Sequence, residues 1–411
     1  MLGELEKKFI QIVKASISNK IYDTDLSLDM LNKIFDLSQK NGLTSIIFSA
    51  LSPNLKKYEK ESSLYQTWKQ FAFQVSLDQY RKAQELREIA VLAEQCNISL
   101  IFIKGPLLAS LYPQYALRYS SDIDLYLSAE DLNVMEGILQ KKGFLHVEDK
   151  SKENVKVFSK EDSIVLELHT RLWEDYESNA IKILEEYRIN DVENKSPYCI
   201  FNNSIIVNGL EYTNHLIFLI FHMIKHFSLG GNKLSFITDI ALYVNYYIDK
   251  LDLQRFWSCI KDAGYEKFTI YIFSIAKDCF NMNSKVFWGK ASLVGYDDVL
   301  DDIINTYNVV DSEKGRYYFM CTIMPYYLGD GKVGKNKFLQ LLYLMFPAQS
   351  ALSPKYSYGK KNKFLLFVSW WHRLFSYFLY VISGNEKYKI SKKFEIVDRK
   401  LTLLKKLNLI E

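Results

Sequence analysis

Residues 101–127, IFIKGPLLASLYPQYALRYSSDIDLYL, contain the pattern that decides the fold. The apolar run that ends at Ile103 predicts a short strand, and the Lys-Gly-Pro sequence after it predicts a tight turn into a helix that continues to Pro113. A second apolar run at 123–127 predicts another strand. The stretch therefore predicts strand, glycine turn, helix and strand, with acidic residues where the second strand begins.

Two acids of this stretch are spaced for a common role. Asp122 and Asp124 lie two residues apart, so in a strand both carboxylates project from the same face. A third acid, Glu167, lies in the predicted strand 163–169. If that strand neighbours the first, three carboxylates converge. They would repel one another unless a cation shares them, and oxygen ligands favour Mg²⁺ or Mn²⁺.

The turn before the helix suggests a place for phosphates. Gly105 lets the backbone approach an anionic ligand closely, and a helix N-terminus offers unpaired N–H groups. Lys104 and Arg118 could add charge-assisted contacts. Two divalent ions beside a bound triphosphate are the machinery of in-line displacement at phosphorus.

These residues together resemble a known family. The run at 101–127, then Gly-Phe at 143–144, then LELHTRLW at 166–173, is similar to the polymerase-β-like nucleotidyltransferase superfamily. More narrowly it resembles the bacterial uncharacterised nucleotidyltransferases, whose pattern is KG-x-x-L, YP, R, DIDL and ELH. The helical flanks, GLTSIIFSAL and a later H…KH…D, are weaker support.

The resemblance implies roles for the acids. Asp122 and Asp124 would be the metal ligands, and Glu167 the third carboxylate, which helps activate the attacking hydroxyl. His169 lies two residues after Glu167, on the same strand face. It could contact a phosphate or the acceptor, or it could orient a neighbouring acid.

The phosphate loop departs from the superfamily. Gly105 and Lys104 would mark the loop that grips the triphosphate, but the superfamily usually has Gly-Ser or Gly-Gly, whereas Pro106 follows here. Proline has no N–H, so one phosphate donor must come from elsewhere, with Lys104 and Leu107 as candidates.

The rest of the chain is mostly helical in pattern. Helices are expected at 5–16, 26–38, 65–96 and 129–142, the last stopped by Gly143, and strands at 144–148, 154–160 and 163–169. Beyond residue 200 the helical period continues. The sequence thus predicts an α+β protein with a helical N-terminal segment (1–65), a small mixed-sheet nucleotidyltransferase core (66–200) and a large helical C-terminal domain (201–411).

A second polar cluster falls in the helical region. His215, His222 and His226 share one helix face, with Lys225 beside them. Zinc is a minor alternative, because the glutamate of HExxH is absent. A stripe that faces the nucleotide across an interdomain cleft and ordinary helix packing both remain open. Asp239 in the next helix could pair with that stripe or have a plain capping or surface role.

Composition sets further limits. The 411 residues carry 52 basic and 48 acidic side chains, and this near balance does not suggest extensive nucleic-acid binding. Five widely spaced cysteines without a CxxC pair favour free thiols in a reducing compartment. The N-terminus has an amphipathic helical pattern and no signal-peptide pattern, so the expected location is cytoplasmic.

One apolar segment complicates that expectation. Residues 364–383 have nearly the length of a membrane span, but His372 and Arg373 lie at the middle. A buried or dimer-forming helix is favoured over a membrane-surface helix or a span, so membrane association is not expected.

The function predicted from the sequence is metal-dependent transfer of a nucleoside monophosphate from a nucleoside triphosphate (NTP) to a hydroxyl, with release of pyrophosphate. The acceptor is expected to be a small molecule, such as a natural product, or a peptide. There are three alternatives. The chain could transfer the nucleotide to tRNA or protein, as a toxin does; it could be a catalytically silent nucleotide-binding regulator; or it could be a membrane-associated biosynthetic subunit. The base and the oligomeric state are left open.

Overall fold

The computed structural model describes most of the chain up to residue 305 and selected parts after it. The described residues are 2–148, 151, 154–160, 164–173, 178–201, 204–228, 232–305, 346, 349, 352, 356, 358–359, 362–382 and 399–410. They belong to two compact units. The first comprises Met1–Met223 and Asn232–Asn305, and the second comprises Ile224–Gly231 and Thr306–Glu411.

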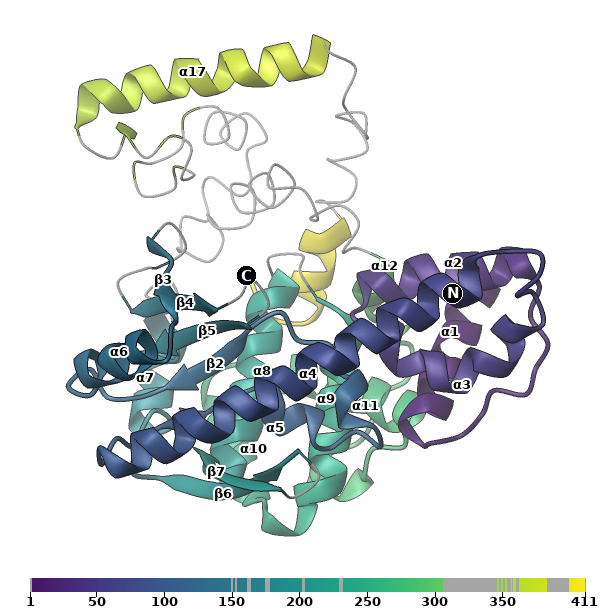
Figure 1. Cartoon of the computed structure of the whole chain (residues 1–411), viewed down its shortest axis with the longest axis horizontal. Coiled ribbons are helices and arrows are strands. Elements are labelled where there is room, and N and C mark those ends of the chain that lie inside the picture. The colour runs from purple at the N-terminus through teal and green to yellow at the C-terminus, as the bar shows by residue number, and fades with distance from the viewer. Residues whose placement is uncertain are drawn as a thin grey trace. The chain divides into compact units, whose positions relative to one another are not determined.

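The first unit is built around a seven-stranded mixed sheet (Figure 1). Its strand order is β3-β4-β5-β2-β1-β7-β6. The strands are β1 (Ile101–Phe102), β2 (Ile123–Tyr126), β3 (Leu145–His146), β4 (Val155–Lys160), β5 (Ile164–His169), β6 (Lys195–Ile200) and β7 (Ile205–Leu210). The α+β class and the mixed sheet are thus confirmed.

Helices surround this sheet and form the N-terminal part of the unit. They are α1 (Glu4–Ile17), α2 (Leu28–Lys40), α3 (Thr44–Lys56), α4 (Leu64–Gln95), α5 (Pro106–Ala109), α6 (Leu132–Lys141), α7 (Ser178–Glu186), α8 (Tyr212–Ser228), α9 (Leu234–Tyr247), α10 (Leu253–Asp262), α11 (Glu266–Phe280) and α12 (Asp297–Asn305). Short 3₁₀ turns occur at Tyr115–Leu117, Ile248–Lys250 and Ser284–Phe287.

The long helix α4 connects the N-terminal helices to the sheet region (Figure 1). It packs against α3 near one end and against α6 near the other. Helix α1 also packs against α11, and α2 against α12, so segments far apart in sequence complete one unit. These contacts bury a large apolar core that includes Phe9, Trp68 and Phe273.

The central strand β2 is covered on both faces. All four of its residues are buried, and Asp124 is the charged one among them. Apolar strands of this kind are usual where helices cover both faces of a sheet. A carboxylate in such a position needs partners, because an unpaired buried charge is very costly.

Two expected helix bounds were wrong. Helix α5 ends at Ala109, four residues before Pro113, and α6 starts at Leu132 instead of residue 129. In the turn before α6, Ser128 Oγ accepts a hydrogen bond from the Asp131 N–H. The predicted stop of that helix is confirmed, since Gly143 has a φ of +84°.

The sheet also continues past residue 200. Strand β7 pairs with β1 in parallel, and β6 pairs with β7, although the sequence pattern was interpreted as helical beyond that residue. Two features concealed these strands. Pro197 interrupts β6, which is tolerated because β6 is an edge strand, and Gly209 interrupts β7. A Cβ at Gly209 would lie 2.5 Å from the Tyr198 ring, so close packing requires glycine there.

The second unit contains helix α17 (Lys363–Ile382), which confirms the helix expected near 364–383. Among the described residues, no helix is long and apolar enough to cross a membrane.

Candidate active site

Two of the predicted acids lie side by side in the sheet. Strands β2 and β5 are parallel neighbours, and the register places Asp124 opposite Glu167. Their side chains therefore project from the same face of the sheet, as expected from the sequence if the two strands are neighbours. The pairing of these strands is what brings together residues that are 43 positions apart in the sequence.

His169 joins this pair. Its Nε2 lies 3.0 Å from Asp124 Oδ1 and 3.5 Å from Glu167 Oε2. One ligand atom from each of the three side chains lies within 4.8 Å of the others, and they form the metal-ligand group found among the described residues. The Asp124 side chain is only 5 % exposed, whereas that of Glu167 is 30 % exposed. We name Asp124, Glu167 and His169 the acid–histidine cluster.

Lys104 supplies positive charge to the acid–histidine cluster. Its Nζ lies 3.0 Å from Asp124 Oδ2 and 3.2 Å from His222 Nε2. Burial alone would raise the pKa of Asp124, but Lys104 and His169 hold it well below its usual range. Burial opposes the charged form of His169, yet hydrogen bonds to Asp124 and Glu167 raise its pKa.

Asp122 lies directly before β2, and its carboxylate is not one of the three groups that lie within 4.8 Å. It is nevertheless electrostatically linked to them. Burial raises its pKa, and the neighbouring charges of Asp124 and Glu167 raise it further, whereas Lys104 opposes the shift. The role of Asp122 as a metal ligand stays a prediction.

The donor set of the acid–histidine cluster fits a divalent cation. Two carboxylates and one imidazole are ligands for Mn²⁺ and related ions, and the carboxylates also suit Mg²⁺. Asp124 and Glu167 sit close enough to share a positive charge, and in the structure Lys104 places its ammonium beside Asp124.

The glycine turn has the strained backbone that only glycine adopts readily. Gly105 has φ +45° and ψ −104°. The Leu107 N–H, one candidate phosphate donor, already donates to the Lys104 carbonyl at 3.1 Å. Helix α5 has only four residues, so its N-terminus is a weak dipole. Of the expected phosphate contacts in this turn, the Lys104 side chain is therefore the stronger.

Gly105→Ala should reduce the free energy of unfolding by about 1–2 kcal/mol, because a left-handed backbone is unfavourable for alanine. Space is not the cause, since the nearest atom to an added Cβ is the Asp122 carbonyl oxygen at 3.6 Å. Urea denaturation measures the change. Gly137→Ala in helix α6, where an added Cβ meets nothing within 4 Å, is the matched control and should be stabilising. Equal effects at both glycines would contradict this explanation.

Aromatic side chains surround Lys104. Its Nζ lies 5.9 Å from the centroid of the Phe218 ring, which stacks on His222 and contacts Trp173. The Trp173 Nε1–H is buried without a hydrogen-bond partner in the described part of the chain. Phe218 and Trp173 were not predicted as site residues, because aromatic residues at helical spacing are more often core.

The histidines of α8 have different surroundings. His222 reaches Lys104, but His215 is fully buried against Tyr198 and Tyr243. Lys225 and His226 lie half-buried in the last turn of α8, within the second unit. Among the described residues these histidines form no metal-ligand group, so nothing here supports zinc.

His215 should make the protein acid-labile. Burial lowers its pKa to about 3, whereas an unfolded histidine has a pKa of about 6.5. Between these values the unfolded chain binds the extra proton, so the free energy of unfolding falls as the pH falls. From pH 7.5 to pH 5.0, the wild type should lose about 2 kcal/mol more than His215→Gln. Urea titrations at both pH values measure this, and parallel pH profiles would contradict it.

Arg118 and Asp239 form a buried ion pair. Arg118 Nε and Nη2 donate to the two Asp239 oxygens at 3.0 and 2.6 Å, and the Tyr112 hydroxyl donates to Oδ1 at 2.8 Å. This pair connects the loop before β2 to α9. Asp239 thus pairs with Arg118. Phosphate binding by Arg118 stays a prediction.

Helix α4 also supports that loop. The Lys82 ammonium donates to the Ser120 carbonyl at 2.6 Å, and Gln79 donates to Ser120 Oγ at 3.3 Å. Both side chains are buried, and burial lowers the pKa of Lys82. The sequence contained one signal for this contact, which is the polar Gln79 within an apolar helical stripe.

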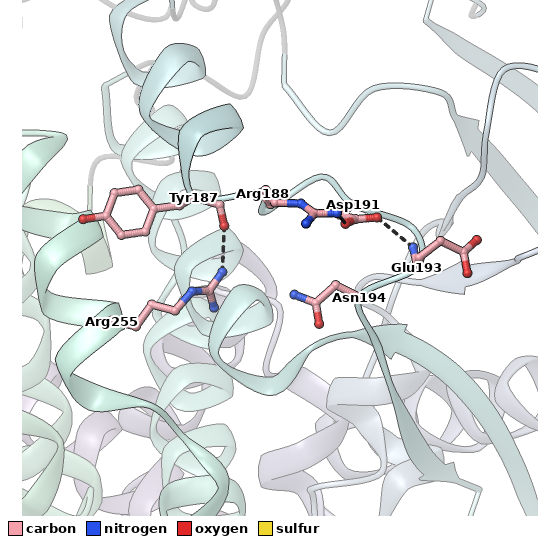
Figure 2. A pocket seen from close by; sticks show the side chains of 6 residues that line it. All are labelled: Tyr187, Arg188, Asp191, Glu193, Asn194 and Arg255. Atoms are coloured by element: carbon pink, nitrogen blue, oxygen red, sulfur yellow. Dashed lines mark hydrogen bonds and ion pairs between the residues drawn. The ribbon is translucent and has the colours of Figure 1, made fainter.

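A separate surface pocket of about 480 Å³ lies between α10 and the segment that joins α7 to β6 (Figure 2). Figure 2 shows Arg188 beside Asp191, and Arg255 donating to the Tyr187 carbonyl. Arg255 also pairs with Glu211. No member of the acid–histidine cluster lines this pocket, and its arginines already have acidic partners, so we do not assign the activity to it.

Comparison with known proteins agrees with the geometry. Residues 31–281, which are more than half of the chain, match the model of the uncharacterised nucleotidyltransferases. This range includes the whole sheet, the acid–histidine cluster and helices α8 to α11. No curated protein matches the chain. The chain belongs to the family of uncharacterised nucleotidyltransferases.

Proposed function

We propose that the protein transfers a nucleoside monophosphate from an NTP to a hydroxyl acceptor and releases pyrophosphate. Family membership supports nucleotidyl transfer in general. The observation that carries the metal-dependent mechanism is the register of β2 and β5, which aligns Asp124 with Glu167 and adds His169 to them.

Asp124 and Glu167, with Asp122 beside them, would hold Mg²⁺ or Mn²⁺. When bound, such a cation neutralises charge on the phosphates and makes the acceptor hydroxyl more acidic. His169 fixes the orientation of both carboxylates through its contacts at 3.0 and 3.5 Å. Precise orientation of ligands by neighbouring hydrogen bonds is what such sites require.

In the proposed reaction the acceptor oxygen attacks the α-phosphorus. The bond between that phosphorus and the oxygen bridging to the β-phosphate breaks, and pyrophosphate leaves. The hydroxyl proton passes to the Glu167 carboxylate, which is the more exposed of the two paired acids and can be reached by an acceptor.

The Lys104 ammonium makes two polar contacts in the structure. It pairs with Asp124 in the structure, and its ammonium also lies near His222. We propose that Lys104 turns to the triphosphate when the nucleotide binds; a cation held by Asp124 would supply the positive charge that Lys104 places there. The ring of Phe218 lies beside Lys104 and contacts Trp173, whose N–H is buried, and the nucleoside would bind here.

The acceptor is proposed to be a small molecule or a peptide. The unit that contains the site has 33 basic and 41 acidic side chains, a net charge of −8. This charge disfavours a large polyanionic acceptor on that unit.

The test is pyrophosphate release by the full chain with each of the four NTPs, Mg²⁺ and fractionated cell extract. Release with at least one NTP is expected, and EDTA should abolish it. NTP binding measured by calorimetry, without product in any fraction, would instead indicate a silent nucleotide-binding regulator.

A further inference from the structure

Helix α17 exposes a continuous apolar stripe. Its members are Phe364, Phe367, Val368, Trp371 and Phe375, which we name the α17 stripe. Phe364 is 74 % exposed and Trp371 is 58 % exposed. Their spacing places them within an arc of about 100° on an α-helix, along three turns. A contiguous exposed patch of large apolar side chains indicates an interaction surface.

The opposite side of the helix is covered. Ser369 is fully buried, and Arg373 is partly covered on the side of the helix opposite Phe364. The covered side also carries apolar side chains, since Trp370 is partly covered and its ring lies 5.4 Å from that of Phe346. Packing among the described residues of this unit leaves the α17 stripe exposed.

The charge of the second unit differs from that of the first. Its 114 residues contain 19 basic and 7 acidic side chains, a net charge of +12 against −8 for the first unit. Residues 331–385, which include α17, contain eight Lys or Arg and no Asp or Glu. The net charge of the whole chain, +4, does not reveal this difference between the two units.

We propose that α17 lies in the surface of an anionic lipid membrane, with the α17 stripe in the acyl–headgroup boundary and basic residues of the 331–385 segment on the lipid phosphates. An interfacial helix combines these two features, and Trp and Phe are suited to that depth. A span is not involved, since no described helix is apolar enough.

A nucleic acid fits the observations less well. Single-stranded nucleic acids bind where basic and aromatic side chains alternate, whereas the α17 stripe contains no basic residue. This inference concerns where the protein works and does not rest on the proposed reaction. It takes up the membrane-surface helix, the less favoured interpretation of residues 364–383 in the sequence.

Vesicle flotation of the full chain tests the proposal. Binding to phosphatidylcholine vesicles with 30 % phosphatidylglycerol is expected, with at least tenfold weaker binding to pure phosphatidylcholine and a decrease at high salt. The double variant Phe367→Asp and Trp371→Asp should bind anionic vesicles at least tenfold more weakly. Both positions are exposed, so circular dichroism should show an unchanged fold.

Two further measurements separate the alternatives. Phe73→Asp, at a 68 % exposed position on α4, is the matched control and should leave vesicle binding unchanged. Equal binding of wild type and double variant would overturn the proposal. Light scattering without lipid would also overturn it if the wild type forms a dimer that the double variant loses. A gel shift with total tRNA would overturn it if the double variant loses the shift and neither protein floats with vesicles.

Discussion

Replacing Asp124 with asparagine is expected to lower NTP-dependent pyrophosphate release by about 10³-fold, because a metal-binding charge at the reaction centre is lost. Asparagine retains the shape, its amide oxygen can accept from Lys104, and its NH2 can donate to a neutral His169 ring. The free energy of unfolding should therefore change by less than about 2 kcal/mol. Pyrophosphate release and urea denaturation on the same preparation measure the two effects.

The control for this variant is Asp131→Asn. Asp131 precedes α6, where its carboxylate accepts a hydrogen bond from Ser128 at 2.8 Å. The chemical change is identical, but the position is outside the acid–histidine cluster, so activity should stay within about twofold of wild type. Undiminished turnover in Asp124→Asn would exclude the mechanism, and equal losses in both variants would point to a general loss of folding.

Asp239→Asn is expected to destabilise the protein by about 3–5 kcal/mol, because it leaves the Arg118 charge buried without its counter-ion. The Arg118 and Asp239 side chains are only 12 % and 4 % exposed. In the wild type Asp239 raises the pKa of Arg118 against the opposing effect of burial. In the variant that effect is lost, but a guanidinium stays protonated in proteins, so Arg118 will not lose its proton to relieve the cost. Urea denaturation at neutral pH measures the loss.

Two comparisons make this result specific. Asp29→Asn removes an exposed partner of Lys33 on α2 and should cost less than about 1 kcal/mol. The double variant Arg118→Met, Asp239→Leu should recover much of the stability lost in Asp239→Asn, because no charge then remains buried. A cost below 1 kcal/mol for Asp239→Asn would show that this buried pair contributes no more to the free energy of unfolding than an exposed pair.

The acid pair was predictable because its signal is local. The two-residue period of a strand places Asp124 with Asp122, and Glu167 with His169, on common faces. The remaining assumption was that the two strands are neighbours, which the pairing of β2 with β5 confirms. The strand pattern and the family resemblance together were therefore sufficient to predict that Asp124, Glu167 and His169 lie together.

Other parts depend on tertiary contacts that no local pattern contains. Arg118 and Asp239 meet across 121 positions of sequence, so their mutual pairing could not be read from spacing. His215 and His222 share a helix face, yet Tyr198 and Tyr243 enclose the first while the second reaches Lys104. Strand β6 was missed because Pro197 is acceptable only on a sheet edge, and the strand order decides which strand lies there.

The central claim is that this site transfers the α-phosphoryl group of an NTP with its nucleoside. It is tested most directly by supplying the same NTP labelled with ³²P at either the α- or the γ-phosphate, with Mg²⁺ and acceptor. We predict α-label in the acceptor and γ-label in pyrophosphate for the wild type, and neither product for Asp124→Asn. Appearance of γ-label in the acceptor, or unchanged α-label transfer by Asp124→Asn, would contradict the account.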